Sequence, residues 1–115
     1  MKAKSILLFA AILFLAMTTV IANAAKTEKI KVYGNCGSCK SRIEKAVKAI
    51  KGVTAATWNK DDAMLTVTFD ENKTSVLKIE EATAKVGHDT DHTRAADKTY
   101  EGLPGCCQYD RPEKK

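Results

Sequence analysis

Residues 34–47 read GNCGSCKSRIEKAV and place two cysteines, Cys36 and Cys39, where a short strand ends and an amphipathic helix begins. Apolar side chains recur at helical spacing after the motif, so we predict a helix over about residues 38–51. Two thiols at this spacing, close to a helix N-terminus, can hold a soft metal ion or form a reactive disulfide. The motif alone does not distinguish metal binding from redox chemistry, so the rest of the sequence is needed to choose between them.

The first 24 residues have the pattern of an export signal. Lys2 and Lys4 precede an apolar run from Ile6 to Met17, and Ala22-Asn23-Ala24 supplies the small residues of a signal peptidase site. We predict cleavage after Ala24 and a soluble periplasmic or secreted protein with no stable membrane insertion. The alternative is a retained membrane anchor, for which the apolar run is marginal because about 30 Å of hydrocarbon must be spanned.

Cleavage would leave 91 residues, enough for one small domain, and would lower the net charge from +5 to +3. Basic residues are interleaved with acidic ones, as in residues 26–29 and 42–45. Such interleaving is typical of a solvated surface, so we expect no nucleic-acid partner. We divide the chain into a signal peptide at 1–24, a domain at 25–94 and a C-terminal extension at 95–115.

The spacing of apolar residues predicts the element order βαββα. We place Ser38 at the start of the first helix as its cap, and Gly52 after its end. In chain order, we expect a strand containing Ile30 and Val32, the helix at 38–51, a strand at 53–59, a turn at 60–62, a strand containing Leu65, Val67 and Phe69, and a helix from Thr74 or Ser75 to Gly87.

The cysteine motif stands in a recognisable frame. It is followed by Gly52-Val53, by ATWN at 56–59, by LTVTFD at 65–70 and by AKVG at 84–87. In this combination the chain resembles the heavy-metal-associated domain, the family of copper chaperones, of the N-terminal modules of copper-pumping ATPases and of periplasmic mercury-binding proteins. The resemblance covers about residues 28–88. It implies an α+β fold, a ferredoxin-like βαββαβ sandwich, here with a weak or irregular last strand and a short C-terminal extension.

The resemblance also implies that the metal ion lies between Cys36 and Cys39. Thiolates are soft ligands suited to Cu(I), Hg(II) or Zn(II), and among these we expect Cu(I). Two ligands on a loop leave the ion under-coordinated, which suits transfer to a partner, whereas a structural zinc site takes four. The predicted function is an exported chaperone or scavenger that passes metal to or from a membrane transporter or efflux system. A metal-bridged dimer is an alternative state.

Two positions depart from the family pattern. The family carries Met two residues before the first cysteine, but this chain has Gly34, so we expect a loosely packed loop. His88 follows the glycine that ends the second helix, and the resemblance places it near the metal loop. The residues alone leave a solvent-exposed loop histidine as the alternative. The polar segment at 89–94 predicts a poor final strand.

The C-terminal extension carries a second pair of cysteines. Residues 95–103 predict a short helix, residues 104–105 break the chain, and Cys106 and Cys107 follow. Adjacent cysteines point in different directions from an extended backbone, so they bridge one another poorly. We expect Cys106, Cys107 and His88 to be additional metal ligands that close the site to three or four. The alternative is a disulfide between this pair and the first motif.

Two other function classes remain open. A CxxC motif at a helix start is also the arrangement of thiol-disulfide redox proteins. That fold needs a cis-proline facing the motif, and the two prolines of this chain, Pro104 and Pro112, both lie in the tail. A small structural domain stapled by disulfides is the other class, although the predicted core needs no staples. The sequence has no Ser-His-Asp set, phosphate loop or HExxH motif, so we do not expect an enzyme.

Overall fold

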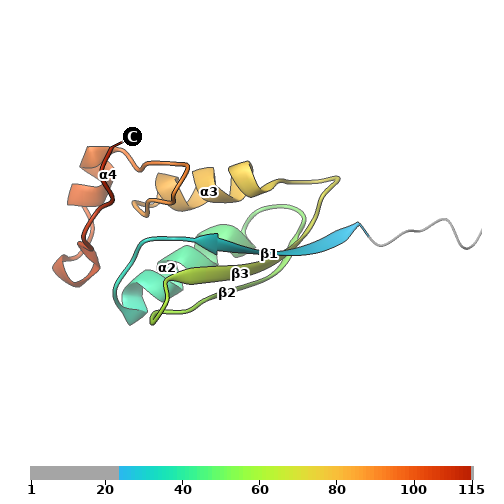
Figure 1. Cartoon of the computed structure of the whole chain (residues 1–115), viewed down its shortest axis with the longest axis horizontal. Coiled ribbons are helices and arrows are strands. Elements are labelled where there is room, and N and C mark those ends of the chain that lie inside the picture. The colour runs from blue at the N-terminus through green and yellow to red at the C-terminus, as the bar shows by residue number, and fades with distance from the viewer. Residues whose placement is uncertain (1–23, 115) are drawn as a thin grey trace, which may run out of the picture.

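The computed structural model describes residues 24–114, so the predicted signal sequence lies outside the described residues apart from Ala24. Its elements in chain order are β1 (Ala25–Lys31), α2 (Gly37–Lys48), β2 (Val53–Trp58), β3 (Met64–Asp70), α3 (Val76–Lys85), α4 (Asp97–Glu101) and the short 3-10 helix η2 (Gly105–Cys107) (Figure 1). The first five follow the predicted order βαββα. Within this described part of the chain, no helix is long and apolar enough to cross a membrane.

The three strands form one antiparallel sheet in the order β1-β3-β2. Side chains alternate along the strands between a buried and an exposed face, as the period of a strand requires. Helix α2 packs on β2, α3 packs near β1, and the two helices contact each other, so both cover the same face of the sheet (Figure 1). The core between these layers contains Ile30, Val32, Ile43, Val47, Trp58, Leu65, Val67, Phe69 and Ile79.

The final strand of the ferredoxin-like fold is reduced to a single bridge between Val32 and Thr90. The backbone N–H of Tyr33 donates to the carbonyl of Asp89 at 2.8 Å, but Thr90 N–H turns away and donates to Thr93 O at 2.8 Å. The side chains of this segment also bond locally, since Thr90 Oγ1 accepts from the N–H of Thr93. This confirms the expected weak or irregular last strand, because polar side chains that bond their own backbone compete with a ladder.

Helix α2 differs from the prediction at both ends. Cys36 rather than Ser38 occupies the N-cap position, with extended backbone angles, and the helix stops at Lys48 instead of residue 51. Gly52 lies in the turn before β2 with a φ of +103°, where a Cβ would meet Lys73 Cβ at 2.7 Å. The glycine is therefore required by the turn into the strand, and the helix ends one turn before it.

Helix α3 begins and ends as its sequence predicts. Ser75 caps it, since its hydroxyl accepts from the N–H of Lys78 at 3.3 Å. Gly87 follows with a φ of +103°, and a Cβ at this position would lie 3.0 Å from Leu103 Cδ2. The glycine thus permits both the left-handed turn and the close approach of the C-terminal extension.

The C-terminal extension folds back onto the domain and includes the predicted short helix as α4. Its anchor is Asp89, which is fully buried. Arg111 donates to this carboxylate through Nε at 2.8 Å and Nη2 at 2.9 Å, and Ala95 N–H donates to it at 2.7 Å. Burial alone would raise the pKa of Asp89, but these donors hold it below its usual value.

Tyr109 adds a second attachment for the extension. Its buried hydroxyl donates to Gly87 O at 2.7 Å and accepts from the N–H of Asp89 at 2.8 Å. Its ring contacts Tyr100 edge-on at a centroid distance of 5.1 Å. These bonds fix the segment that carries Cys106 and Cys107 relative to the end of α3.

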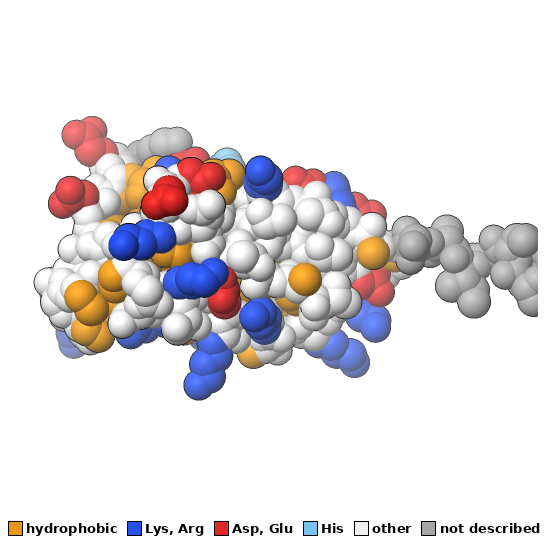
Figure 2. All heavy atoms as spheres, turned by 90° about the horizontal axis from the view of Figure 1, so that it is seen from below, with side chains coloured by type: hydrophobic (Ala, Val, Ile, Leu, Met, Phe, Trp, Pro, Cys, Tyr) orange, Lys and Arg blue, Asp and Glu red, His pale blue; other side chains and the backbone are white. Residues whose placement is uncertain are grey.

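The surface is mixed in character. On the face shown in Figure 2, basic side chains are spread out with acidic ones among them, and hydrophobic side chains gather in small separate groups. Leu77 is the large hydrophobic side chain that is exposed in the described residues.

We predict that Arg111→Ala lowers the free energy of unfolding by about 3 kcal/mol, because it leaves the buried Asp89 carboxylate without its charged partner. Urea unfolding followed by the fluorescence of Trp58 measures this change. Lys73→Ala is the matched control, since it removes an exposed ion pair to Asp70 with a 4.0 Å separation and should cost less than about 1 kcal/mol. Equal unfolding midpoints for the two variants would contradict the anchoring role.

Candidate metal site

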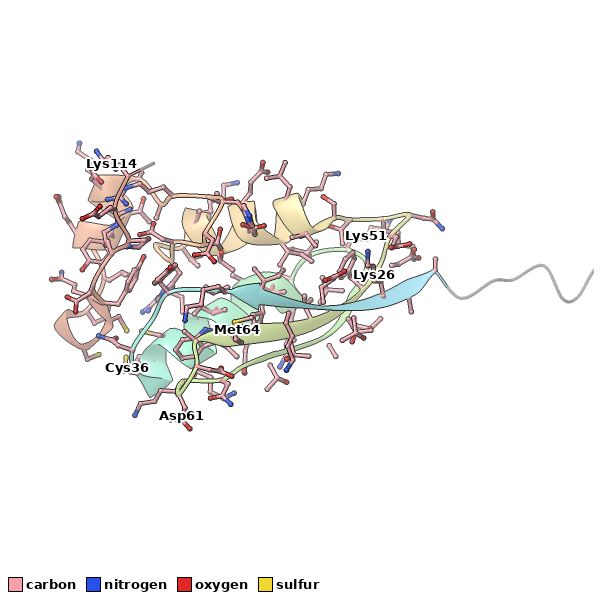
Figure 3. All side chains as sticks on the ribbon, viewed as in Figure 1. Lys26, Cys36, Lys51, Asp61, Met64 and Lys114 are labelled. Carbon is pink, nitrogen blue, oxygen red and sulfur yellow. The ribbon has the colours of Figure 1, made fainter. Side chains whose placement is uncertain are left out.

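The first cysteine motif lies at the N-terminus of α2. Cys36 is the N-cap residue and Cys39 lies in the first turn, with Lys40 N–H donating to Cys36 O at 3.1 Å. Figure 3 labels Cys36 at the end of the molecule where α2 begins, and η2 of the extension contacts α2 there. The positive end of the helix dipole therefore lies beside Cys36 and favours its thiolate form.

The extension brings a third thiol against the motif. Cys36 Sγ lies 3.3 Å from Cys39 Sγ and 3.2 Å from Cys107 Sγ, although Cys107 is 71 residues away in sequence. Cys106 Sγ is 3.8 Å from Cys107 Sγ, and the sulfurs of Cys36, Cys106 and Cys107 all lie within 4.8 Å of one another. All four cysteines are free thiols. Cys36 is therefore the sulfur at which the two cysteine pairs meet.

The surroundings of the sulfurs shift the pKa values of Cys36 and Cys107 in opposite directions. Burial would raise the pKa of Cys36, but contacts from Cys107 Sγ and from the backbone and thiol of Cys39 together lower it to about 6. Burial raises the pKa of Cys107, against the opposing effect of Arg42, whose Nη1 donates to its sulfur at 3.3 Å. Cys39 Sγ donates to Asn35 Oδ1 at 3.4 Å. The Cys36 thiol is therefore more acidic than the Cys107 thiol.

The loop before the motif is packed, contrary to the expectation from Gly34. The indole of Trp58 fills the space under the loop, and a Cβ on Gly34 would lie 3.0 Å from Trp58 Cζ2 and 3.1 Å from Cys39 Cβ. Trp58 is fully buried, and its Nε1–H donates to Val32 O at 2.9 Å. A large side chain from the sheet thus takes the room that the family's methionine would occupy.

His88 is fully buried, so the alternative of a solvent-exposed loop histidine is wrong. Its Nδ1 bonds Tyr33 O at 2.8 Å, and its ring stacks on Tyr109 at a centroid distance of 5.4 Å. Since a carbonyl oxygen only accepts, Nδ1 carries the hydrogen and Nε2 presents a lone pair. Burial lowers the pKa of His88, and its Nε2 has no hydrogen-bond partner among the described residues. The histidine does not belong to the group of three sulfurs within 4.8 Å.

Sequence reasoning did not single out Arg42, Asp89 or Arg111. The position of Arg42 near the cysteines could have been predicted, because it follows Cys39 by three residues and so lies on the same side of α2. The ion pair between Asp89 and Arg111 could not have been predicted. It joins two polar segments 22 residues apart, and no local sequence pattern indicates that either segment is buried.

Comparisons with known proteins agree with this geometry. The family described as Heavy-metal-associated domain matches residues 35–89. The mercuric transport protein periplasmic component of Pseudomonas aeruginosa is 33% identical over 82 residues, which are 70% of this chain and 90% of that protein. This chain belongs to the heavy-metal-associated domain family. It is therefore a heavy-metal-binding protein that uses cysteines for soft metals, and not an enzyme, as its sequence predicted.

Two further relatives are copper proteins by name. The copper chaperone CopZ of Staphylococcus aureus is 36% identical over 55 residues, which are 48% of this chain and 81% of that protein. A solved structure of CopZ metallochaperone superposes with a TM-score of 0.55 at 35% identity and covers 56% of this chain and 98% of its own. These matches confirm the ferredoxin-like fold. Cys106 and Cys107 lie beyond the residues 35–89 that the family pattern matches.

We predict that Gly34→Ala destabilises the protein by about 1–3 kcal/mol, because the added methyl group forces Trp58 or the cysteine loop to move. Gly37→Ala is the control, since no atom lies within 4 Å of its added Cβ. Thermal unfolding and the emission maximum of Trp58 report the two effects. If Gly34→Ala behaved like Gly37→Ala in both measurements, the close packing of Trp58 under the loop would be refuted.

Proposed function

We propose that this protein is an exported carrier or scavenger of a soft metal ion, with Cu(I) as its cargo and Hg(II) or Zn(II) as the alternatives. The observation that supports this most directly is the set of three sulfurs, Cys36, Cys106 and Cys107, within 4.8 Å at the N-terminus of α2, with Cys39 Sγ 3.3 Å from Cys36. In this proposal Cys36 and Cys39 are the primary ligands. Cys107 is the third, because its buried sulfur already touches Cys36.

The charge around the site suits a thiolate-bound monovalent ion. Several thiolates around Cu(I) carry excess negative charge, and the guanidinium of Arg42 lies next to Cys107 Sγ at 3.3 Å. The helix N-terminus adds partial positive charge on the side of Cys36 and Cys39. Sulfur ligands in low coordination number are the environment that Cu(I) prefers among biological ligands.

His88 is an auxiliary ligand in the proposal. Its Nε2 is buried, carries a lone pair and lacks a hydrogen-bond partner among the described residues. A buried nitrogen of this kind is costly unless something satisfies it. A soft or borderline metal ion held by the cysteine thiolates is one group that would do so.

The partner in the proposal is a membrane transporter or efflux system that accepts the ion through thiolates of its own. A relative is named a mercuric transport protein periplasmic component, and others are named copper chaperones. Thiolate exchange between carrier and transporter requires a site near the surface, and Cys36 is only half-buried. A metal-bridged dimer through two such sites is the competing use of the same surface.

We predict that Cys36→Ser combined with Cys39→Ser abolishes Cu(I) binding, and that Cys107→Ser alone weakens it by about tenfold or more, because each loses soft ligands. Competition with a Cu(I) chelator under reducing, oxygen-free conditions measures the affinity. Native mass spectrometry of residues 25–115 gives the stoichiometry, with Zn(II) and Hg(II) as competitors.

Ser38→Ala is the control for these variants, since it changes the motif without removing a sulfur and should bind as the wild type does. Undiminished binding in the double variant would refute the site. Retention of Hg(II) in preference to Cu(I) would identify Hg(II) as the cargo. A ratio of two protein chains to one metal ion would indicate the bridged dimer.

For export, we predict that the full-length chain produced in a bacterium with a periplasm is recovered there, beginning at Ala25. Small residues at 22 and 24 are needed by signal peptidase, so Ala24→Tyr should leave the longer precursor in the membrane fraction. Fractionation and intact mass measure both outcomes. An uncleaved wild-type chain in the membrane would instead support a retained anchor.

A further inference from the structure

The four thiols differ sharply in their access to solvent. Cys39 and Cys107 are fully buried, Cys36 is half-buried, and Cys106 is exposed. Cys106 is nevertheless within reach of the same ion, because its sulfur lies within 4.8 Å of those of Cys36 and Cys107. The buried sulfur of Cys107 and the exposed sulfur of Cys106 are therefore close enough to contact the same ion.

A metal ion held only by the buried sulfurs would be hard for an acceptor to reach. Ligand exchange between two proteins proceeds through an intermediate in which sulfurs of both contact the ion. An incoming thiolate must reach the ion itself. Cys39 and Cys107 are fully buried while the extension is anchored by Asp89 and Arg111, so access to the ion is from the side of Cys36 and Cys106. Release through an exposed sulfur avoids the cost of lifting that anchor.

The surroundings of Cys106 are open. An added Cβ on Gly105, its neighbour in η2, would have no atom within 4 Å, and the same holds for Gly37, the neighbour of Cys36. Two glycines thus border the two accessible sulfurs. The loop of an acceptor could therefore lie against both sulfurs without a steric clash.

We propose that Cys106 is the exchange thiol of this site. It binds the ion during entry and exit, and it is not one of the ligands that hold the ion at rest. This inference rests on the proposed function and adds to it the route by which the ion moves: from Cys39, Cys36 and Cys107 to Cys36, Cys107 and Cys106, and then to the acceptor.

The exchange is balanced at each step. One sulfur–metal bond forms as another breaks, and the ion keeps its oxidation state. If the incoming sulfur is a thiol, its proton passes to the thiolate that leaves the ion. No oxidant or reductant is required.

The test compares Cys106→Ser with Cys107→Ser, each loaded with one equivalent of Cu(I) under reducing conditions. The acceptor is a ¹⁵N-labelled copy of the metal-free wild-type chain, so mass distinguishes donor from acceptor. Rapid mixing followed by native mass spectrometry gives the transfer rate, and competition with a chelator gives the affinity. Ser38→Ala is the control, because it changes a residue of the motif without removing a sulfur and without adding bulk beside Cys36 or Cys106.

We expect Cys106→Ser to transfer copper at least about tenfold more slowly while its affinity stays within about threefold of wild type. Cys107→Ser should instead lose affinity, and Ser38→Ala should match the wild type in both. Wild-type transfer rates in Cys106→Ser would overturn the inference. It would also be overturned if this variant lost as much affinity as Cys107→Ser, or if it bound one copper where the wild type binds two. A wild-type chain that binds no soft metal would refute the proposed function itself.

Discussion

The buried ion pair between Asp89 and Arg111 is the interaction on which the arrangement of the site depends. A carboxylate with no exposure to solvent is tolerated only when its charge is paired and its oxygens are hydrogen-bonded. Arg111 and the N–H of Ala95 meet that requirement, and both belong to the segment after the family domain. The extension therefore compensates the buried charge of Asp89, and Asp89 in turn anchors the extension.

A continuous set of contacts leads from this ion pair to the loop that carries Cys36. Tyr109 bonds the backbone of Gly87 and Asp89 and stacks on His88, and His88 bonds the carbonyl of Tyr33 just before the cysteine loop. The loop is supported from below by Trp58, whose indole lies against Gly34. The position of Cys107 next to Cys36 therefore depends on the contacts of Trp58, His88 and Tyr109 as well as on the ion pair.

The extension changes what the shared fold can do with a metal ion. A pair of thiols on a loop at a helix N-terminus leaves an ion under-coordinated and easily passed on, whereas additional thiolates hold it more firmly. Here a buried sulfur, Cys107, and an exposed one, Cys106, come from the same short turn. In our proposal, Cys107 retains the ion and Cys106 releases it, so the two roles fall on adjacent residues of one turn.

The sequence by itself determined the order βαββα, the position of the cysteine motif at the start of α2, and the reduced last strand. These follow from local causes: alternation in the strands, helical spacing after the motif, glycines at positive φ, and polar residues that bond their own backbone. Only the tertiary structure decided that Cys107 meets Cys36, that His88 is buried, and that Trp58 packs against Gly34 under the loop. Each of these joins segments distant along the chain, and such contacts depend on how whole elements pack, which no local periodicity encodes.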